Sequence, residues 1–159
     1  LMRYPVFRDV LATRDPIVVT RKNPRDDLAT VLRSGAEKLK RGVSVVVFPQ
    51  TTRTRRFDPS RFNTIGVKLA RRAGVPVVPV ATKSDAWRSD GWPIKDFGRF
   101  DAQAEVRLAF GEPMAVEGTG KMTNRAVIAF ISEHLRRWGL EVAEAADGGV
   151  DGDRSTPGP

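Results

Sequence analysis

Residues Gly42–Phe57 read GVSVVVFPQTTRTRRF, an apolar run that passes directly into a polar, cationic segment. Val43–Phe48 is continuous rather than alternating, which predicts a strand buried on both faces of a parallel sheet. An amide, threonines and three arginines follow within Gln50–Arg56. Because ligands of open α/β sheets bind at the carboxyl ends of the strands, this stretch predicts a binding loop that begins at Gln50.

The chemistry of that loop suits a phosphate. Thr51 and Thr52 offer hydroxyl donors, and Arg53 offers a planar guanidinium that can contact two phosphate oxygens. Arg21 ends an earlier β-branched run, Pro16–Arg21, which we interpret as another strand. If the two strands are parallel neighbours, Arg21 and Arg53 point into the same crevice. A solvated cationic rim is the alternative interpretation, and it describes the arginines after Arg53 best.

The flanking sequence alternates between helical and extended patterns. Helices are expected over 23–41, 62–73 and 123–138, and further strands over 75–81 and 106–110, the first of these interrupted by two prolines. This alternation predicts a single α/β layered domain, residues 1–140, with a mostly parallel central sheet flanked by helices. An acidic segment rich in Gly and Pro, residues 141–159, is expected to be a disordered tail.

Charge and composition narrow the classes of ligand. The chain has 159 residues and a net charge of +8; the tail carries −4, which leaves +12 for residues 1–140. Such a body favours phosphorylated substrates, anionic membrane surfaces or nucleic acid. There is no cysteine and one histidine, so no thiolate nucleophile or metal site is expected. No apolar run reaches the ~20 residues of a membrane-spanning helix.

Several blocks resemble one known family in order along the chain. FPQTTR, Phe48–Arg53, resembles the FPEGTR block of the glycerophospholipid acyltransferases, the lysophosphatidate acyltransferase family. IVVTRKN (17–23) resembles the family block before it, and VPVVPVA (75–81) the block after it. PIKDFG (93–98) and VRLAFGEPM (106–114) occupy the places of a similar loop and strand. The resemblance extends over residues 1–140.

The resemblance implies transfer of an acyl group from acyl-CoA or acyl-carrier protein to a lysophospholipid such as lysophosphatidate, with no cofactor. It also implies roles for individual residues. Two arginines would hold the acceptor's phosphate, and the loop that begins at Gln50 would shape the acceptor pocket. The remaining residues would be structural positions within the family's sequence blocks. The substrate-binding residues are Arg21, Gln50, Thr51, Thr52 and Arg53, and the structural ones are Phe48, Pro49 and Pro76.

Three departures from the family pattern matter. The family's His-x4-Asp block, whose histidine is the base and whose aspartate orients it, is absent; the one histidine, His134, has Gly139 five positions later. The resemblance therefore implies no catalytic residue in this chain, a truncated N-terminus and little activity. Gln50 and Thr51 stand where the family has glutamate and glycine, which leaves the acceptor headgroup open but keeps the role of Arg53.

A peripheral location on the cytoplasmic side of a membrane follows from the family. Trp87 and Trp92, beside Arg88 and Lys95, suit either a headgroup boundary or the core. The alternative from another class is a non-catalytic anion-, lipid- or nucleic-acid-binding module. Nucleic acid is disfavoured because aromatic residues are not interleaved with the scattered cations. A degenerate acyltransferase kept as a binding domain is the third hypothesis.

Overall fold

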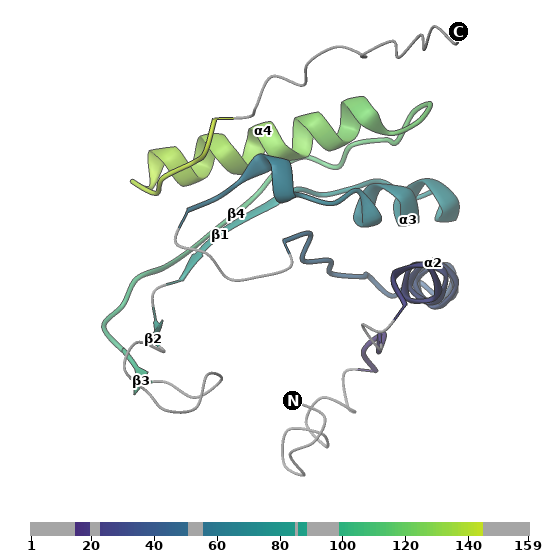
Figure 1. Cartoon of the computed structure of the whole chain (residues 1–159), viewed down its shortest axis with the longest axis horizontal. Helices are drawn as coiled ribbons and strands as arrows, with labels where there is room; N and C mark the ends of the chain where they lie inside the picture. The colour runs from purple at the N-terminus through teal and green to yellow at the C-terminus, as the bar shows by residue number, and fades with distance from the viewer. Residues whose placement is uncertain (1–14, 20–22, 51–55, 85, 89–98, 145–159) are drawn as a thin grey trace, which may run out of the picture.

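The computed structural model describes residues 15–19, 23–50, 56–84, 86–88 and 99–144 (Figure 1). The elements are, in chain order, α2 (Pro24–Lys40), η1 (Pro59–Arg61), α3 (Ile65–Ala73), β1 (Val80–Ser84), β2 (Trp87–Arg88), β3 (Arg99–Phe100), β4 (Val106–Phe110) and α4 (Lys121–Arg137). Helices and short strands together make a mixed α/β fold. The three long helices agree with the predicted ones, except that 62–64 precede α3.

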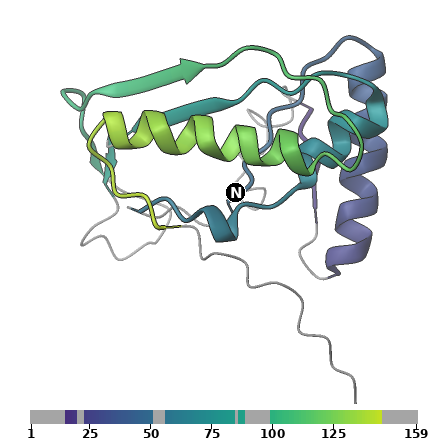
Figure 2. The ribbon, with the colours of Figure 1, turned by 90° about the horizontal axis from the view of Figure 1, so that it is seen from above.

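The strands of the described chain pair as two antiparallel ribbons. β1 pairs with β4 from Val80↔Phe110 to Ser84↔Val106, and β2 pairs with β3. Helix α4 runs alongside the β1/β4 pair and packs on β1, where Ala81 is fully buried (Figure 2). The alternating strand predicted at 106–110 is confirmed. Its apolar side chains Val106, Leu108 and Phe110 share one face and are all exposed.

Helix α2 has the local signals that its sequence predicts. The Asn23 side chain accepts a hydrogen bond from the Arg25 N–H, and Pro24 occupies the first turn. Helix α2 packs on α3 at Gly35, where an added Cβ would lie 2.7 Å from a Leu69 methyl carbon. Leu69 is 2% exposed. The absence of a side chain on Gly35 therefore brings the two helices close together.

The expected parallel sheet is not formed by the described residues. Val43–Pro49 has no strand hydrogen-bonding pattern, nor do residues 16–19, while residues 20–22 lie outside the described part. Val46 and Phe48 are 77% and 79% exposed. A continuous apolar strand is stable when other elements cover both of its faces. None of the strands in the described part of the chain pairs with Val43–Pro49.

The predicted strand over 75–81 also differs in position. It begins only at Val80, after a single antiparallel bridge between Val77 and Met114. Pro76 and Pro79 have no N–H to donate, so regular pairing starts after the second proline. The two prolines thus interrupt the pairing, and the regular strand lies further along the chain than predicted.

Candidate functional site

The beginning of the predicted loop is attached to the N-terminus of α3. Both the backbone N–H and the side-chain amide of Asn63 donate to the Pro49 carbonyl oxygen, with N···O distances of 3.3 and 2.5 Å. The Asn63 side-chain oxygen accepts from the Ile65 N–H at 3.1 Å. Gly66 lies against Val47, whose Cβ would be 3.7 Å from an added Cβ. Asn63 therefore joins the FPQTTR block to the first turn of α3.

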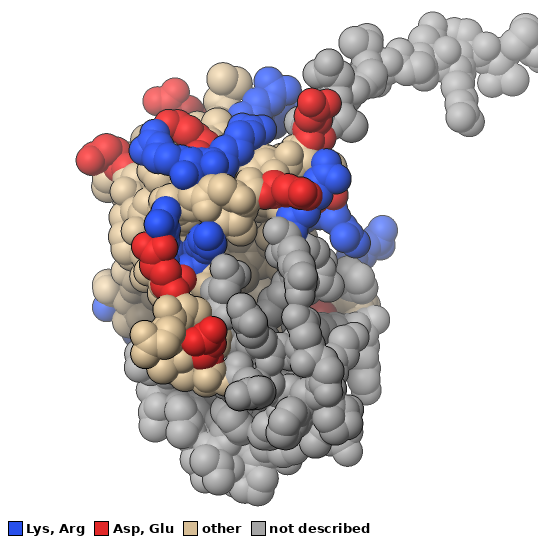
Figure 3. Space-filling view, turned by 90° about the vertical axis from the view of Figure 1, so that its left-hand side faces the viewer, with Lys and Arg blue, Asp and Glu red and all other residues tan. Residues whose placement is uncertain are grey.

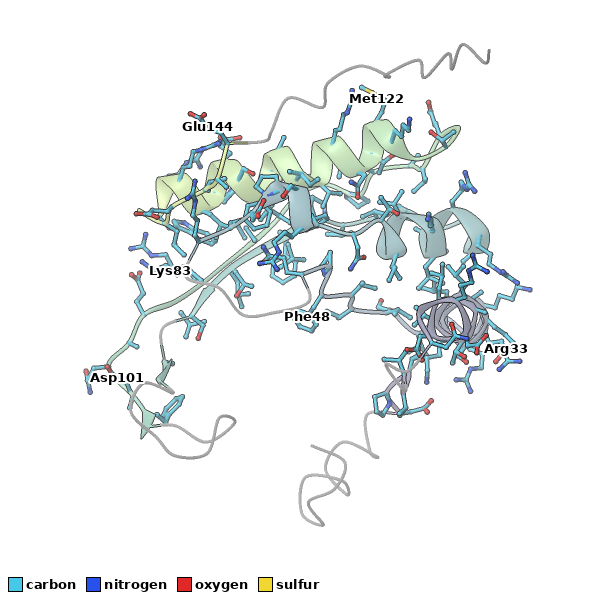
Figure 4. All side chains as sticks on the ribbon, viewed as in Figure 1. Arg33, Phe48, Lys83, Asp101, Met122 and Glu144 are labelled. Atoms are coloured by element: carbon cyan, nitrogen blue, oxygen red, sulfur yellow. The ribbon has the colours of Figure 1, made fainter. Side chains whose placement is uncertain are left out.

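This attachment has an electrostatic consequence. The N-terminus of a helix carries a partial positive charge that favours anions within the first turn. Figure 4 shows Phe48 on the segment between α2 and the centre of the molecule, on the opposite side of β1 and β4 from α4. Gln50 follows it and is half-buried. The loop therefore starts beside a favourable potential for a phosphate.

The end of the predicted loop is held by the C-terminal part of the described chain. The Phe57 N–H donates to the Glu141 carbonyl at 3.0 Å, and the Ala143 N–H donates to the Phe57 carbonyl at 2.7 Å. These bonds form a parallel bridge between Phe57 and Val142. The Phe57 ring is buried and contacts Phe62 edge-on at 6.0 Å. Sequence reasoning missed this contact, because a single bridge has no periodic pattern.

Just after Phe57, an acidic side chain organises the backbone. Asp58 accepts from the Ser60 hydroxyl at 2.6 Å and from the Ser60 N–H at 3.0 Å, and so begins η1. The Ser60 hydroxyl is the main cause that lowers the pKa of Asp58, helped by the Ser60 N–H and by Arg61 and Arg56. The carboxylate is therefore ionised at neutral pH.

The predicted site residues fall into two groups. Phe48 is exposed, Pro49 and Gln50 are half-buried, and all three are described. Arg21, Thr51, Thr52 and Arg53 lie outside the described residues, as does Trp92, so their placement stays a prediction.

Pro76 lines a shallow cavity of about 260 Å³ at the C-terminal end of α3, with Ala70, Arg71, Gly74, Val75, Ala115 and Val116. That cavity is at the other end of α3 from Pro49.

His134 is a packed helix residue. Its Nδ1 lies 2.9 Å from the Phe130 carbonyl oxygen one turn earlier in α4. Its ring lies 4.2 Å from that of Phe130 and 5.9 Å from that of Trp138. These contacts place His134 within an aromatic stripe along one face of α4. They are the contacts of a structural residue near a helix C-terminus.

Comparison with protein families matches residues 1–83 to the family described as acyltransferase. The chain belongs to the acyltransferase family. It is also 31% identical over 139 residues to a 1-acyl-sn-glycerol-3-phosphate acyltransferase of Pseudomonas aeruginosa, which covers 85% of this chain and 52% of that protein. The predicted resemblance to the glycerophospholipid acyltransferases is thereby confirmed.

The acyltransferase match covers the part of the chain that holds the candidate site. Residues 1–83 include Arg21, the loop from Gln50 to Arg53, and Pro76. The chain spans about half the length of the curated relative that it matches. No solved structure matches it. Among the helices that the structure describes, none is long and apolar enough to cross a bilayer.

Proposed function

We propose that this chain supplies the acceptor-binding part of a glycerolipid acyltransferase. The enzyme transfers an acyl group from acyl-CoA or acyl-carrier protein to a lysophospholipid such as lysophosphatidate. The family match over residues 1–83 carries this proposal, because every proposed substrate contact lies within it. The Pseudomonas relative is a 1-acyl-sn-glycerol-3-phosphate acyltransferase, which supports the choice of a phosphate-bearing acceptor.

The proposed reaction needs no metal or organic cofactor. A hydroxyl oxygen of the acceptor attacks the thioester carbonyl carbon, the carbon–sulfur bond breaks, and the thiol leaves. A general base takes the hydroxyl proton as the new ester bond forms. The role of this chain is to hold the acceptor: Arg53 and Arg21 bind the phosphate, and Gln50 accepts or donates a hydrogen bond at the glycerol hydroxyls.

The phosphate role of Arg53 is tested by comparing two acceptors. Charge-assisted hydrogen bonds contribute about 1.5–3 kcal/mol each. We therefore expect Arg53→Ala to weaken lysophosphatidate binding by roughly tenfold or more. Binding of the monoacylglycerol with the same acyl chain should change little, because it has no phosphate. Isothermal titration calorimetry with both ligands measures the difference.

A matched control is Arg55→Ala, which removes the same charge from a position interpreted as solvated rim. It should weaken lysophosphatidate binding much less than Arg53→Ala does. Equal losses for the two acceptors in the Arg53 variant would remove the phosphate role. A nucleic-acid-binding module would instead bind DNA with a steep salt dependence and be indifferent to Arg53→Ala.

A different experiment distinguishes a degenerate acyltransferase, kept as a binding domain, from an acyltransferase that lacks only its general base. Gln50→Glu is combined with a preceding segment that carries His-x4-Asp, and acyl transfer is measured. If acyl transfer appears when the segment is added without Gln50→Glu, the chain lacks only its general base. Activity that never appears supports a domain retained for binding.

We also propose peripheral binding to anionic membrane on the cytoplasmic side. The +12 charge of residues 1–140 supports it. Figure 3 shows cations interspersed with carboxylates on the face at the C-terminal end of α4, so binding should be diffuse rather than a single strong patch. We expect co-sedimentation with phosphatidylcholine vesicles that contain phosphatidylglycerol and release at high salt. Equal sedimentation with pure phosphatidylcholine would contradict the electrostatic account.

The mostly parallel sheet belongs to the same proposal. The side chains of Val46 and Phe48 are exposed in the described structure, and a strand at Val43–Phe48 would bury them if sheet neighbours covered it. If Val43–Phe48 forms such a strand, its backbone hydrogen bonds should slow the hydrogen exchange of the Val45–Val47 amides.

A further inference from the structure

The C-terminal end of α3 combines a hollow with a row of cations. The cavity of about 260 Å³ there is lined by glycine and small apolar residues, with Arg71 as its charged member. Sites that enclose a whole small molecule usually have about 300–1,000 Å³. A shallow hollow of this size therefore suits one ring system of a larger ligand.

The exposed side of α3 beside the cavity is cationic. Lys68, Arg71 and Arg72 are spaced by three and four residues, which places them on one side of the helix, and all three are exposed. Helix α3 has no acidic residue. The segment before α4, which forms the other wall, carries two carboxylates, Glu112 and Glu117. Three cations against two carboxylates leave an excess of positive charge around the cavity.

The negative end of the helix dipole opposes an anion here only weakly. The last carbonyl groups of a helix carry partial negative charge. Two of those of α3 accept hydrogen bonds from the N–H groups of Gly74 and Val75, at 3.3 and 3.1 Å. These carbonyl groups are thus engaged within the helix cap, and the cations extend further from the helix than they do.

We propose that this end of α3 binds the nucleotide part of acyl-CoA, with the adenine ring in the cavity and the phosphate groups along Arg71, Arg72 and Lys68. The nucleotide of CoA places a flat aromatic ring a few bonds from three phosphates, which matches a hollow beside a row of cations. This inference rests on the proposed acyl transfer. It selects acyl-CoA as the donor rather than acyl-carrier protein.

The location also suits the reach of the donor. Helix α3 has 9 residues, so its ends are about 14 Å apart at a rise of 1.5 Å per residue. At the opposite end, Asn63 holds Pro49, the residue before Gln50. The thioester of acyl-CoA lies at the far end of a pantetheine arm, which is longer than α3 when extended. A donor anchored at the cavity can therefore present its thioester near Gln50, where we propose that the acceptor binds.

Different cations should contact different phosphates. Arg71 lines the cavity and should contact the 3′-phosphate, which is attached to the same ribose as the adenine. Its Nη1 donates to the Gly118 carbonyl at 3.2 Å, which fixes one side of the guanidinium and leaves its other donors for a ligand. Lys68 lies about one turn nearer the N-terminus of α3 and should contact the 5′-diphosphate, where the pantetheine arm begins.

The phosphate contacts are tested by titrating CoA and 3′-dephospho-CoA into residues 1–159 in a calorimeter. Arg71→Ala should weaken CoA binding about three- to tenfold but 3′-dephospho-CoA binding less than about twofold. Lys68→Ala should weaken both ligands alike, and Arg72→Ala repeats the test without removing the bond to Gly118. Arg33→Ala is the matched control, because it removes an exposed arginine from α2 (Figure 4).

Ala115→Phe tests the cavity. Ala115 is exposed and lines the hollow, and only its backbone carbonyl accepts from the Thr123 hydroxyl, at 3.2 Å. The added ring should fill the hollow and weaken CoA binding by about tenfold or more. Binding of 4′-phosphopantetheine, which lacks the nucleotide, should not change. Ala129→Phe adds the same ring at an exposed position of α4 and is the control. Thermal unfolding identifies the variants that are folded at the assay temperature.

The outcomes separate this site from the acceptor site. Selective loss of CoA binding in Arg71→Ala or Arg72→Ala, together with weak CoA binding in Ala115→Phe, supports the nucleotide site. Wild-type CoA affinity in these folded variants, or no CoA binding by the wild type, overturns it. Binding of acyl-carrier protein but not CoA would also overturn it. Lysophosphatidate affinity should be unchanged in all these variants, so its measurement tests the proposed acceptor role independently.

Discussion

Residues 1–159 alone are expected to bind lysophosphatidate but to transfer acyl groups at about one hundredth to one ten-thousandth of the rate of a chain that includes the general base. A positioned base contributes ~10²–10⁴-fold to such a reaction. The one histidine of this sequence, His134, is bound to Phe130 and packed against Trp138 on α4. Release of free thiol from acyl-CoA, followed with a thiol reagent in the presence of lysophosphatidate, measures the rate.

His134→Gln provides the control for this prediction. The residual rate of residues 1–159 should not change, because His134 is assigned a packing role. A longer coding sequence that places His-x4-Asp before Leu1 should restore the rate, and His134→Gln should leave that rate unchanged as well. Substantial turnover by residues 1–159 that His134→Gln abolishes would make His134 the base and overturn the assignment.

Gly120→Ala is expected to destabilise the fold by about 2–5 kcal/mol. Gly120 precedes α4 with φ +78°, and an added Cβ would lie 2.5 Å from a Val67 methyl carbon and 3.2 Å from one of Val116. Left-handed backbone costs an L-residue about 1–2 kcal/mol, and overpacking about 1–3 kcal/mol. This is a large part of the ~5–15 kcal/mol that stabilises a typical domain. Urea unfolding followed by circular dichroism measures the free energy.

The matched variant is Gly118→Ala, two residues earlier. Gly118 also has positive φ, +51°, but nothing lies within 4 Å of an added Cβ. Gly118→Ala should therefore lower the free energy of unfolding only by the backbone contribution of about 1–2 kcal/mol. The difference between the two variants therefore isolates the contact of Gly120 with Val67. Equal losses would mean that α3 and the start of α4 do not pack as described.

The helices were predictable because their signals are local. Asn23, Pro24 and the acidic first turn mark the start of α2, and Gly74 with φ +68° marks the end of α3. The strand at 106–110 was predictable from its alternation. Sheet pairing depends on neighbours instead. Val43–Phe48 has strong strand propensity, but pairing and coverage decide whether it becomes a strand, and neither is encoded in the segment itself.

For the candidate site too, the local sequence signals were predictable and the contacts between distant residues were not. The FPQTTR block and the family were recognisable from short motifs in order, and the match over residues 1–83 confirms the family. The contacts that hold the block, Asn63 with Pro49 and Ala143 with Phe57, join residues 14 and 86 positions apart. Asn63 before a helix looks like an ordinary cap in the sequence. Its second bond, to Pro49, becomes visible only when α3 and the block are placed together.

The claim that supports the rest is that Arg21 and Arg53 bind one phosphate. A double-mutant cycle with Arg21→Ala, Arg53→Ala and the double variant tests it, using lysophosphatidate affinities from calorimetry. If both guanidinium groups contact the same phosphate, the two losses should be non-additive, with a coupling energy of about 0.5–3 kcal/mol. The same cycle with monoacylglycerol should show no coupling. Losses for lysophosphatidate that add to within about 0.3–0.5 kcal/mol would mean that the two arginines act at separate places, and the proposed site would be wrong.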